Sequence, residues 1–125
     1  SFKLYTMLPE IWGPHMWMSI HSIAISFPDN PSQSDKKNYK QFFSHLSKVL
    51  PCKSCSISFR KYMKILPIEK YLTSRKRLLY WTYLIHNKVN KKLNKNIKVS
   101  WGGVRKKYFK LSKLNCKNKY LKNNN

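Results

Sequence analysis

The stretch WTYLIHNKVNKKLNK, residues 81–95, decides the fold. Within it, four residues recur at i, i+3, i+4 and i+7, which is one face of an α-helix: His86, Val89, Asn90 and Leu93. Trp81, little more than one turn earlier, is expected to add aromatic surface to this face. An imidazole, an amide and apolar surface together suit a flat heteroaromatic ligand with a polar edge. The alternative is that His86 and Asn90 are satisfied polar residues at a seam between helices.

The rest of the chain predicts more helices around this one. Apolar residues at helical spacing, caps such as Ser32–Asp35 and Thr73–Ser74, and stopping prolines define the expected helices: 11–27, 32–50, 52–66, 73–93 and a short fifth over about 101–111. Pro14 lies near the start of the first, where a helix tolerates proline. The chain has only three glycines, which argues against a fold with many strands and tight turns. We expect an all-α fold, a four-helix bundle with a short fifth helix, over residues 1–111, followed by a basic, flexible tail over 112–125.

Composition excludes several classes of protein. The chain has 125 residues, 26 Lys and Arg against four Asp and Glu, and a net charge of +22. Four acidic residues are too few for a supported carboxylate dyad or an all-oxygen calcium site. No apolar run approaches the roughly 20 residues of a membrane span. The first residues also lack the pattern of a secretory signal.

The positive charge leaves a second class of function open. Lysine and arginine together suit phosphate backbones, so a small basic nucleic-acid-binding helical protein is the alternative function. Only four of the basic residues are arginine, the side chain that best recognises phosphate and bases. No specific nucleic-acid partner is therefore expected.

Cys52 and Cys55 form a CxxC pair at the start of the third predicted helix. Residues three apart on one helical turn are close enough to form a disulfide. The helix N-terminus and Lys53 both stabilise a thiolate, which is the reactive form. The sequence thus predicts a redox-active pair.

Three other interpretations of the cysteines are weaker. A zinc site needs four ligands, and His15 and His21 lie six residues apart on one helix, so they point to different faces. No metal is therefore expected. A purely structural disulfide would close a very small loop and would therefore add little stability. A thioredoxin-like fold would need strands around the pair.

The first helix offers a surface that matches the fourth. Trp17 and His21 are four residues apart, so their side chains stack on one face. Together with Trp81 and His86, they predict a redox disulfide beside an aromatic cofactor.

Four stretches resemble the Erv/ALR sulfhydryl oxidases in order and spacing: WGPxxW (12–17), IHS (20–22), LPCxxC (50–55) and WxxxxHNxVNxxLxK (81–95). The resemblance covers about residues 9–110. The short form, rich in lysine and asparagine, looks most like the versions carried by large DNA viruses.

This resemblance implies a flavin-linked thiol oxidase, usually a homodimer. It implies electron transfer from protein dithiols, or from a redox relay protein, through the CxxC pair to FAD and then to O₂, giving H₂O₂. Cys55 would be next to the flavin and Cys52 would face the substrate. The residues implied to line FAD are Gly13, Trp17, His21, Lys48, Trp81, His86, Asn87, Val89, Asn90, Leu93, Lys95 and Trp101.

The chain also departs from the family pattern. It lacks the cysteines for the extra disulfides that many members carry, and Pro14 stands where many cellular relatives have arginine. Cys116 alone cannot form an intrachain shuttle pair, and we expect it to be a free thiol, with pairing between subunits or a mixed disulfide as alternatives. If the protein is viral, we expect it in the host cytoplasm, at a virus assembly site or in the virion.

Overall fold

The structure is a computed structural model that describes residues 5–95 and 99–119, with side chains through residue 112. The described residues contain five α-helices, one 3₁₀ segment and no strand, in agreement with the all-α prediction. The elements are α1 (Pro9–Ile25), α2 (Gln33–Leu46), α3 (Lys53–Ile65), η1 (Ile68–Tyr71), α4 (Arg75–Lys92) and α5 (Trp101–Lys119).

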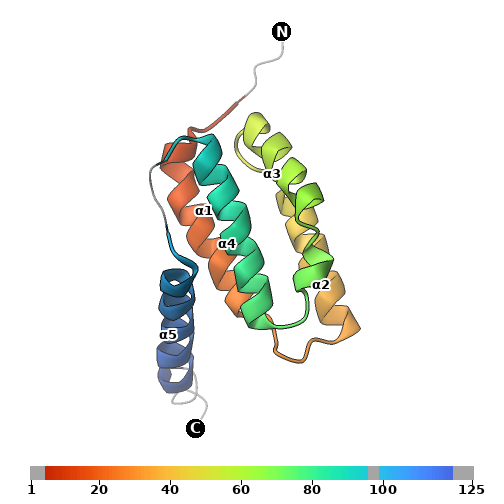
Figure 1. Cartoon of the computed structure of the whole chain (residues 1–125), viewed down its shortest axis with the longest axis vertical. Coiled ribbons are helices and arrows are strands. Elements are labelled where there is room, and N and C mark those ends of the chain that lie inside the picture. Colours follow the sequence, from red (N-terminus) through yellow and green to blue (C-terminus); the bar gives the residue numbers. More distant parts are fainter. Residues whose placement is uncertain (1–4, 96–98, 120–125) are drawn as a thin grey trace.

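Helix α4 is at the centre of the bundle (Figure 1). It packs against α1, α3, α5 and η1, while α2 contacts η1. Helix α5 packs against α1 as well as α4, on the side away from α2 and α3 (Figure 1). Residues from four separate parts of the sequence therefore meet along α4.

The predicted caps begin two of these helices. Ser32 Oγ accepts from Asp35 N at 3.0 Å, and Asp35 Oδ2 accepts from Ser32 N at 2.9 Å, which is a complete capping box at α2. Ser74 Oγ accepts from Arg77 N at 3.2 Å at the start of α4. Each side chain satisfies a backbone N–H that has no partner within its helix.

Helix α2 ends at Leu46, four residues before the predicted end. The chain then forms tighter turns with bonds between residues three apart: Lys48 N donates to His45 O at 3.0 Å, and Val49 N donates to Leu46 O at 3.1 Å. Leu50 precedes Pro51, and a residue before proline is disfavoured in the α conformation. The prediction of a helix through Leu50 did not take into account this effect of Pro51 on the residue before it.

Two other expectations are corrected. Helix α1 begins at Pro9, so Pro14 lies inside the helix and not near its start. Helix α5 continues to Lys119 and is not short, so part of the expected tail is helical; residues 120–125 lie outside the described part of the chain. Cys116 falls on α5, but its side chain is also outside the description.

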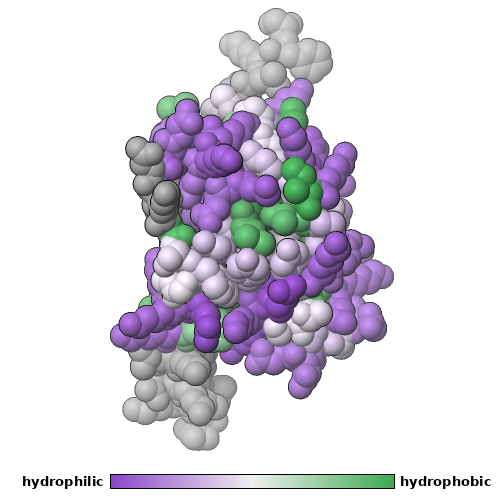
Figure 2. All heavy atoms as spheres, in the orientation of Figure 1, coloured by the Kyte–Doolittle hydropathy of each residue, from purple (hydrophilic) through white to green (hydrophobic). Residues whose placement is uncertain are grey.

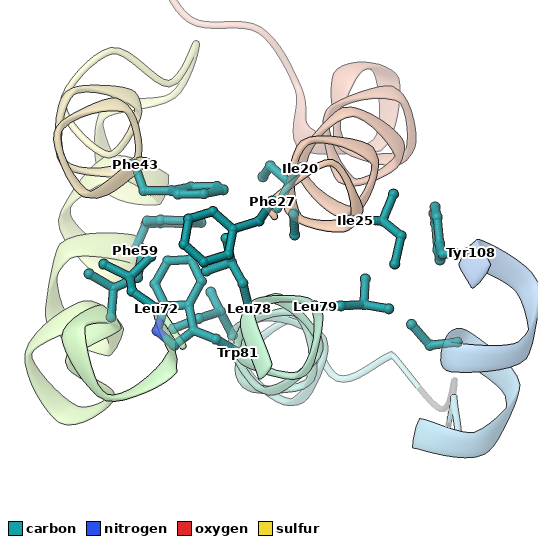
Figure 3. Close-up of a cluster of buried hydrophobic side chains, with 14 residues drawn as sticks. Ile20, Ile25, Phe27, Phe43, Phe59, Leu72, Leu78, Leu79, Trp81 and Tyr108 are labelled. Carbon is teal, nitrogen blue, oxygen red and sulfur yellow. The ribbon is translucent and has the colours of Figure 1, made fainter. Parts of the chain in front are cut away.

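Buried side chains join the elements in two groups (Figure 3). Phe43, Phe59 and Trp81 meet between α2, α3 and α4, with the Phe43 and Trp81 ring centroids 5.1 Å apart. Ile25, Leu79 and Tyr108 lie between α1, α4 and α5 (Figure 3). The first group packs the middle of α3 against α4, and the second attaches α5 to the bundle.

The surface is mostly hydrophilic on the face that Figure 2 shows, with one compact group of hydrophobic side chains near its middle. Among the described residues, the one ion pair joins Lys40 and Glu69 at 2.9 Å. No described helix has the length and apolar character needed to span a bilayer.

We predict that Ser32→Ala lowers the free energy of unfolding by about 1 kcal/mol, because the mutation removes the capping hydrogen bond of α2. Urea denaturation followed by circular dichroism measures this change. Ser34→Ala on the same helix is the matched control, with an expected change within about 0.5 kcal/mol. Equal effects of the two mutations would contradict the assigned cap.

Candidate redox and cofactor site

The two cysteines lie at the first turn of α3 and are joined by a disulfide, with their Cα atoms 5.2 Å apart. Cys52 is the N-cap residue, and its Sγ accepts from Cys55 N at 3.3 Å. The helix N-terminus thus points its N–H groups toward the sulfur atoms, which favours the thiolate form after reduction.

The extended segment before α1 holds the cysteine loop in place. Met7 N donates to Pro51 O at 2.9 Å, and Thr6 Oγ1 donates to the same oxygen at 3.3 Å. Trp12 Nε1 donates to Met7 O at 2.8 Å, so α1 is attached to this segment. The start of α3 is therefore fixed beside the start of α1.

Cys55 forms part of the wall of a hollow between α1, α3 and α4. The hollow has a cavity volume of about 70 Å³, so it is smaller than the roughly 300–1,000 Å³ of a typical small-molecule site. Its wall is mainly apolar, with lysines and an asparagine: Pro9, Trp12, Gly13, Met16, Trp17, Ile20, Leu50, Cys55, Phe59, Val89, Asn90, Lys92, Leu93 and Lys95.

A second hollow lies between α1, α4 and α5 and has a cavity volume of about 350 Å³, which is within the usual size of small-molecule sites. Both histidines of the predicted site reach it, together with residues of α5: Pro14, Trp17, Met18, His21, His86, Asn90, Lys95, Val99, Gly103, Val104, Lys107 and Tyr108. Trp17, Asn90 and Lys95 line both hollows, which are therefore neighbouring parts of one site.

Trp17 stacks on His86, with ring centroids 4.0 Å apart and planes inclined by 9°. It also stacks on His21, one turn along α1, at 5.8 Å, as the spacing predicted. The flat surface between the two hollows is therefore built by α1 and α4 together.

The two histidines also bond to each other. His21 Nε2 and His86 Nδ1 are 3.1 Å apart, and His21 Nδ1 is 2.9 Å from Thr82 Oγ1. Burial, then His86, then Lys107 lower the pKa of His21 to about 3. Burial and then Lys95 lower the pKa of His86 to about 4. Both imidazoles are neutral near pH 7.

The C-terminus of α4 positions Lys95. Asn94 has a positive φ of 52°, Asn94 N donates to Lys91 O at 3.2 Å, and Lys95 N donates to Asn90 O at 3.0 Å. These bonds form a Schellman motif, with asparagine in the left-handed position that usually holds glycine. The chain therefore turns back, and Lys95 lies beside Asn90 at the junction of the hollows.

The structure brings together most of the residues implied to line FAD. The residues that line one or both hollows are Gly13, Trp17, His21, His86, Val89, Asn90, Leu93 and Lys95. Gly13 lies one turn inside α1, not at its start.

Four of the implied residues line neither hollow, so their contact with FAD stays a prediction: Lys48, Trp81, Asn87 and Trp101. Trp81 is fully buried in the core, where its Nε1 donates to Leu66 O at 2.8 Å. Five residues correspond to about 500° of helix rotation, so Trp81 lies far around α4 from His86. Lys48 is exposed before α3, and Trp101 packs against Tyr80 and Tyr83.

The sequence prediction missed several wall residues. On α1, the i, i+4 spacing of Trp12 and Met16 could have indicated a shared face, and both line the first hollow. Lys107 and Tyr108 come from α5, and no sequence signal shows that α5 packs beside His21. Burial raises the pKa of Tyr108, so its hydroxyl stays protonated near neutral pH.

The wall fits FAD, the cofactor that the sequence resemblance implied. Gly13 is buried, yet a Cβ at this position would have no atom within 4 Å, so the backbone itself forms the wall there. Aromatic rings suit the flat ring systems of FAD, and Lys92, Lys95 and Lys107 suit its phosphates. No group of three or more metal-ligating side chains occurs in the part of the chain that the structure describes.

We predict that the free energy of unfolding falls as the pH is lowered from about 6.5 toward 3. The unfolded chain binds protons at His21 and His86 near the ordinary imidazole pKa of 6.5, whereas the folded chain does so only near 3 and 4. Urea denaturation at several pH values between about 7 and 4 measures this loss.

His86→Phe, which keeps a stacking ring, should reduce the pH dependence. The matched control is His15→Phe, because His15 is exposed on α1 and this mutation should leave the dependence unchanged. An unfolding free energy that stays constant over this pH range would show that the two histidines are not buried in the neutral form.

Comparisons with known proteins give the family of the chain. The Erv1 / Alr family model matches residues 14–111. A probable FAD-linked sulfhydryl oxidase of Acanthamoeba polyphaga mimivirus is 40% identical over 85 residues, which are 67% of this chain and 59% of that protein. An FAD-linked sulfhydryl oxidase of African swine fever virus is 35% identical over 97 residues, 78% of this chain and 79% of that protein.

Solved structures give the same result. The crystal structure of the yeast Erv1 core has a TM-score of 0.75 at 33% identity and covers 86% of this chain and 89% of its own. The FAD binding domain of Erv1 from Saccharomyces cerevisiae also has a TM-score of 0.75, at 35% identity, with 82% and 94% covered. The chain spans about three fifths of the mimivirus relative and about four fifths of the swine fever virus relative. With the family model matching most of its length, this chain belongs to the Erv1 / Alr family.

Proposed function

We propose that the protein is an FAD-dependent thiol oxidase that makes disulfide bonds in protein substrates. The observation that carries the proposal is that Cys55, half of a disulfide at a helix N-terminus, forms part of the wall of an aromatic, lysine-bearing hollow. Family membership and the names of the viral relatives support the same activity.

The two sulfur atoms have different surroundings and therefore different roles. Cys52 lines neither hollow, and it is the sulfur that a substrate thiolate attacks. A mixed disulfide forms at Cys52, and Cys55 leaves as a thiolate that the N-terminus of α3 stabilises. A second substrate thiolate then attacks the substrate sulfur of the mixed disulfide. The substrate leaves as a disulfide and Cys52 is released reduced.

Bound FAD would supply the two-electron chemistry that links the reduced cysteine pair to O₂, with H₂O₂ as product. Trp17 and Cys55, which line the same hollow, would hold this cofactor and present the sulfur to it. Lys92, Lys95 and Lys107 provide positive charge for its phosphates. His21 and His86 remain neutral and add no charge beside the rings.

We also propose that the protein acts as a homodimer on protein dithiols, directly or through a redox relay protein. If the protein is viral, we propose that it works in the host cytoplasm, at a virus assembly site or in the virion. The viral relatives support a viral origin. Leu8 and Ile11 support self-association, because both are apolar residues at the start of α1 and are 61% and 60% exposed. Light scattering after gel filtration would give twice the chain mass for a dimer and 15.0 kDa for a monomer.

The purified protein should be yellow, with flavin absorbance that remains after desalting. Extracting the flavin and adding FAD back should restore both the spectrum and oxygen consumption with dithiothreitol. A colourless protein that does not take up FAD would contradict the proposal.

Cys52→Ser and Cys55→Ser should each lower oxygen consumption with dithiothreitol at least about a hundredfold, because each mutation removes the disulfide that receives the substrate electrons. Both variants should still bind FAD, which the absorbance spectrum reports. Cys116→Ser is the matched control and should keep the activity. Substantial turnover by Cys55→Ser would show that electrons bypass the pair.

A further inference from the structure

A chain of hydrogen bonds runs from the backbone of α4 through His21 of α1 to His86 of α4, which lines the second hollow. Thr82 Oγ1 lies 2.6 Å from Leu79 O and 2.9 Å from His21 Nδ1. On the other side of the ring, His21 Nε2 is 3.1 Å from His86 Nδ1. Thr82 is fully buried and His21 is 3% exposed, so water does not compete with their bond.

The first bond of the chain fixes the direction of the others. The hydroxyl of Thr82 has one proton, and its shorter contact, 2.6 Å to Leu79 O, assigns that proton to the carbonyl oxygen. Thr82 Oγ1 must then accept from His21, which places a proton on His21 Nδ1. Both imidazoles are neutral, so His21 Nε2 carries no proton and accepts from His86 Nδ1.

The other end of the chain is then an acceptor. With its proton on Nδ1, His86 has an unprotonated Nε2, and no hydrogen bond among the described residues uses that nitrogen. The buried side-chain atoms without a partner are Ser56 Oγ and Arg75 Nε, so His86 Nε2 is not among them and has open surface. His86 lines the second hollow.

The reversed arrangement would have the opposite effect. If His21 Nε2 donated to His86 Nδ1, the proton of His86 would move to Nε2, and the hollow would receive a donor in place of an acceptor. The unprotonated His21 Nδ1 would then receive a hydrogen bond only if the Thr82 hydroxyl gave up its 2.6 Å bond to Leu79 O. Thr82 therefore disfavours this state.

We propose that Thr82 is a positioning residue that selects one tautomer of the His21–His86 pair, so that His86 Nε2 accepts a hydrogen bond from an N–H or O–H group of the bound cofactor. Thr82 lines neither hollow and acts only through the two histidines. The role of the acceptor rests on the proposed function, whereas the tautomer assignment concerns the chain alone.

The tautomers can be measured without the flavin. Two-bond ¹H–¹⁵N correlation spectra of the cofactor-free protein near pH 7 distinguish protonated from unprotonated ring nitrogens. We expect Nδ1 to be protonated and Nε2 unprotonated in both His21 and His86, with the exposed His15 and His45 as internal references. Protonated Nε2 atoms on both buried histidines would overturn the proposal.

Thr82→Val keeps the shape of the side chain but removes the hydroxyl. We expect the proton of His86 to move toward Nε2 and the dissociation constant for FAD to rise about tenfold, roughly the loss of one buried hydrogen bond. Thr82→Ser keeps the hydroxyl and should restore both the tautomers and the affinity. Thr73→Val, at an exposed threonine, is the matched control and should change neither.

The outcomes separate this proposal from the proposed function. Wild-type tautomers in a folded Thr82→Val protein would show that Thr82 does not select them, whatever the protein does with thiols. If Thr82→Val fails to fold, the wild-type and Thr82→Ser spectra still decide between the two directions. Expected tautomers in a protein that never binds FAD would reject the oxidase and leave the role of Thr82 standing.

Discussion

The packing of α1 against α4 is the interaction on which the site depends. It stacks Trp17 on His86 at 4.0 Å and brings His21 within hydrogen-bond distance of His86. Both hollows have walls from these two helices, with α3 completing one and α5 the other. The disulfide can serve a cofactor only because the segment before α1 holds the cysteine loop beside the same helix. The geometry of this pair of helices thus connects the sulfur chemistry to the aromatic surface.

Local signals in the sequence predicted the helices well because the determinants of a helix are local. The Ser32 and Ser74 caps bond as their spacing indicated, and CxxC forms the first turn of α3. Trp81 lies in the core and not on the face of His86, because five residues correspond to about 500° of helix rotation. Its neighbours in the core, Phe43 and Leu66, come from other elements, which periodicity within α4 cannot reveal.

The contribution of α5 could not be predicted, because it depends on tertiary packing. Lys107 and Tyr108 reach the second hollow because Tyr108 packs on α1, against His21 and Met18. The composition of this region, rich in lysine and asparagine, suggested a tail from residue 112, whereas the helix continues to Lys119. The same limit applies to Thr82, which was an unremarked residue of the fourth helix until the fold placed His21 beside it.

The most direct test of the account is a crystal structure of the protein with FAD bound. The account predicts the isoalloxazine ring in the hollow between α1, α3 and α4, with Cys55 Sγ in contact with it and Trp17 against a ring of the cofactor. Lys92, Lys95 and Lys107 should be the residues nearest the phosphates of FAD. A flavin bound elsewhere on the chain, or a hollow closed by side chains with Cys55 remote from the cofactor, would contradict it.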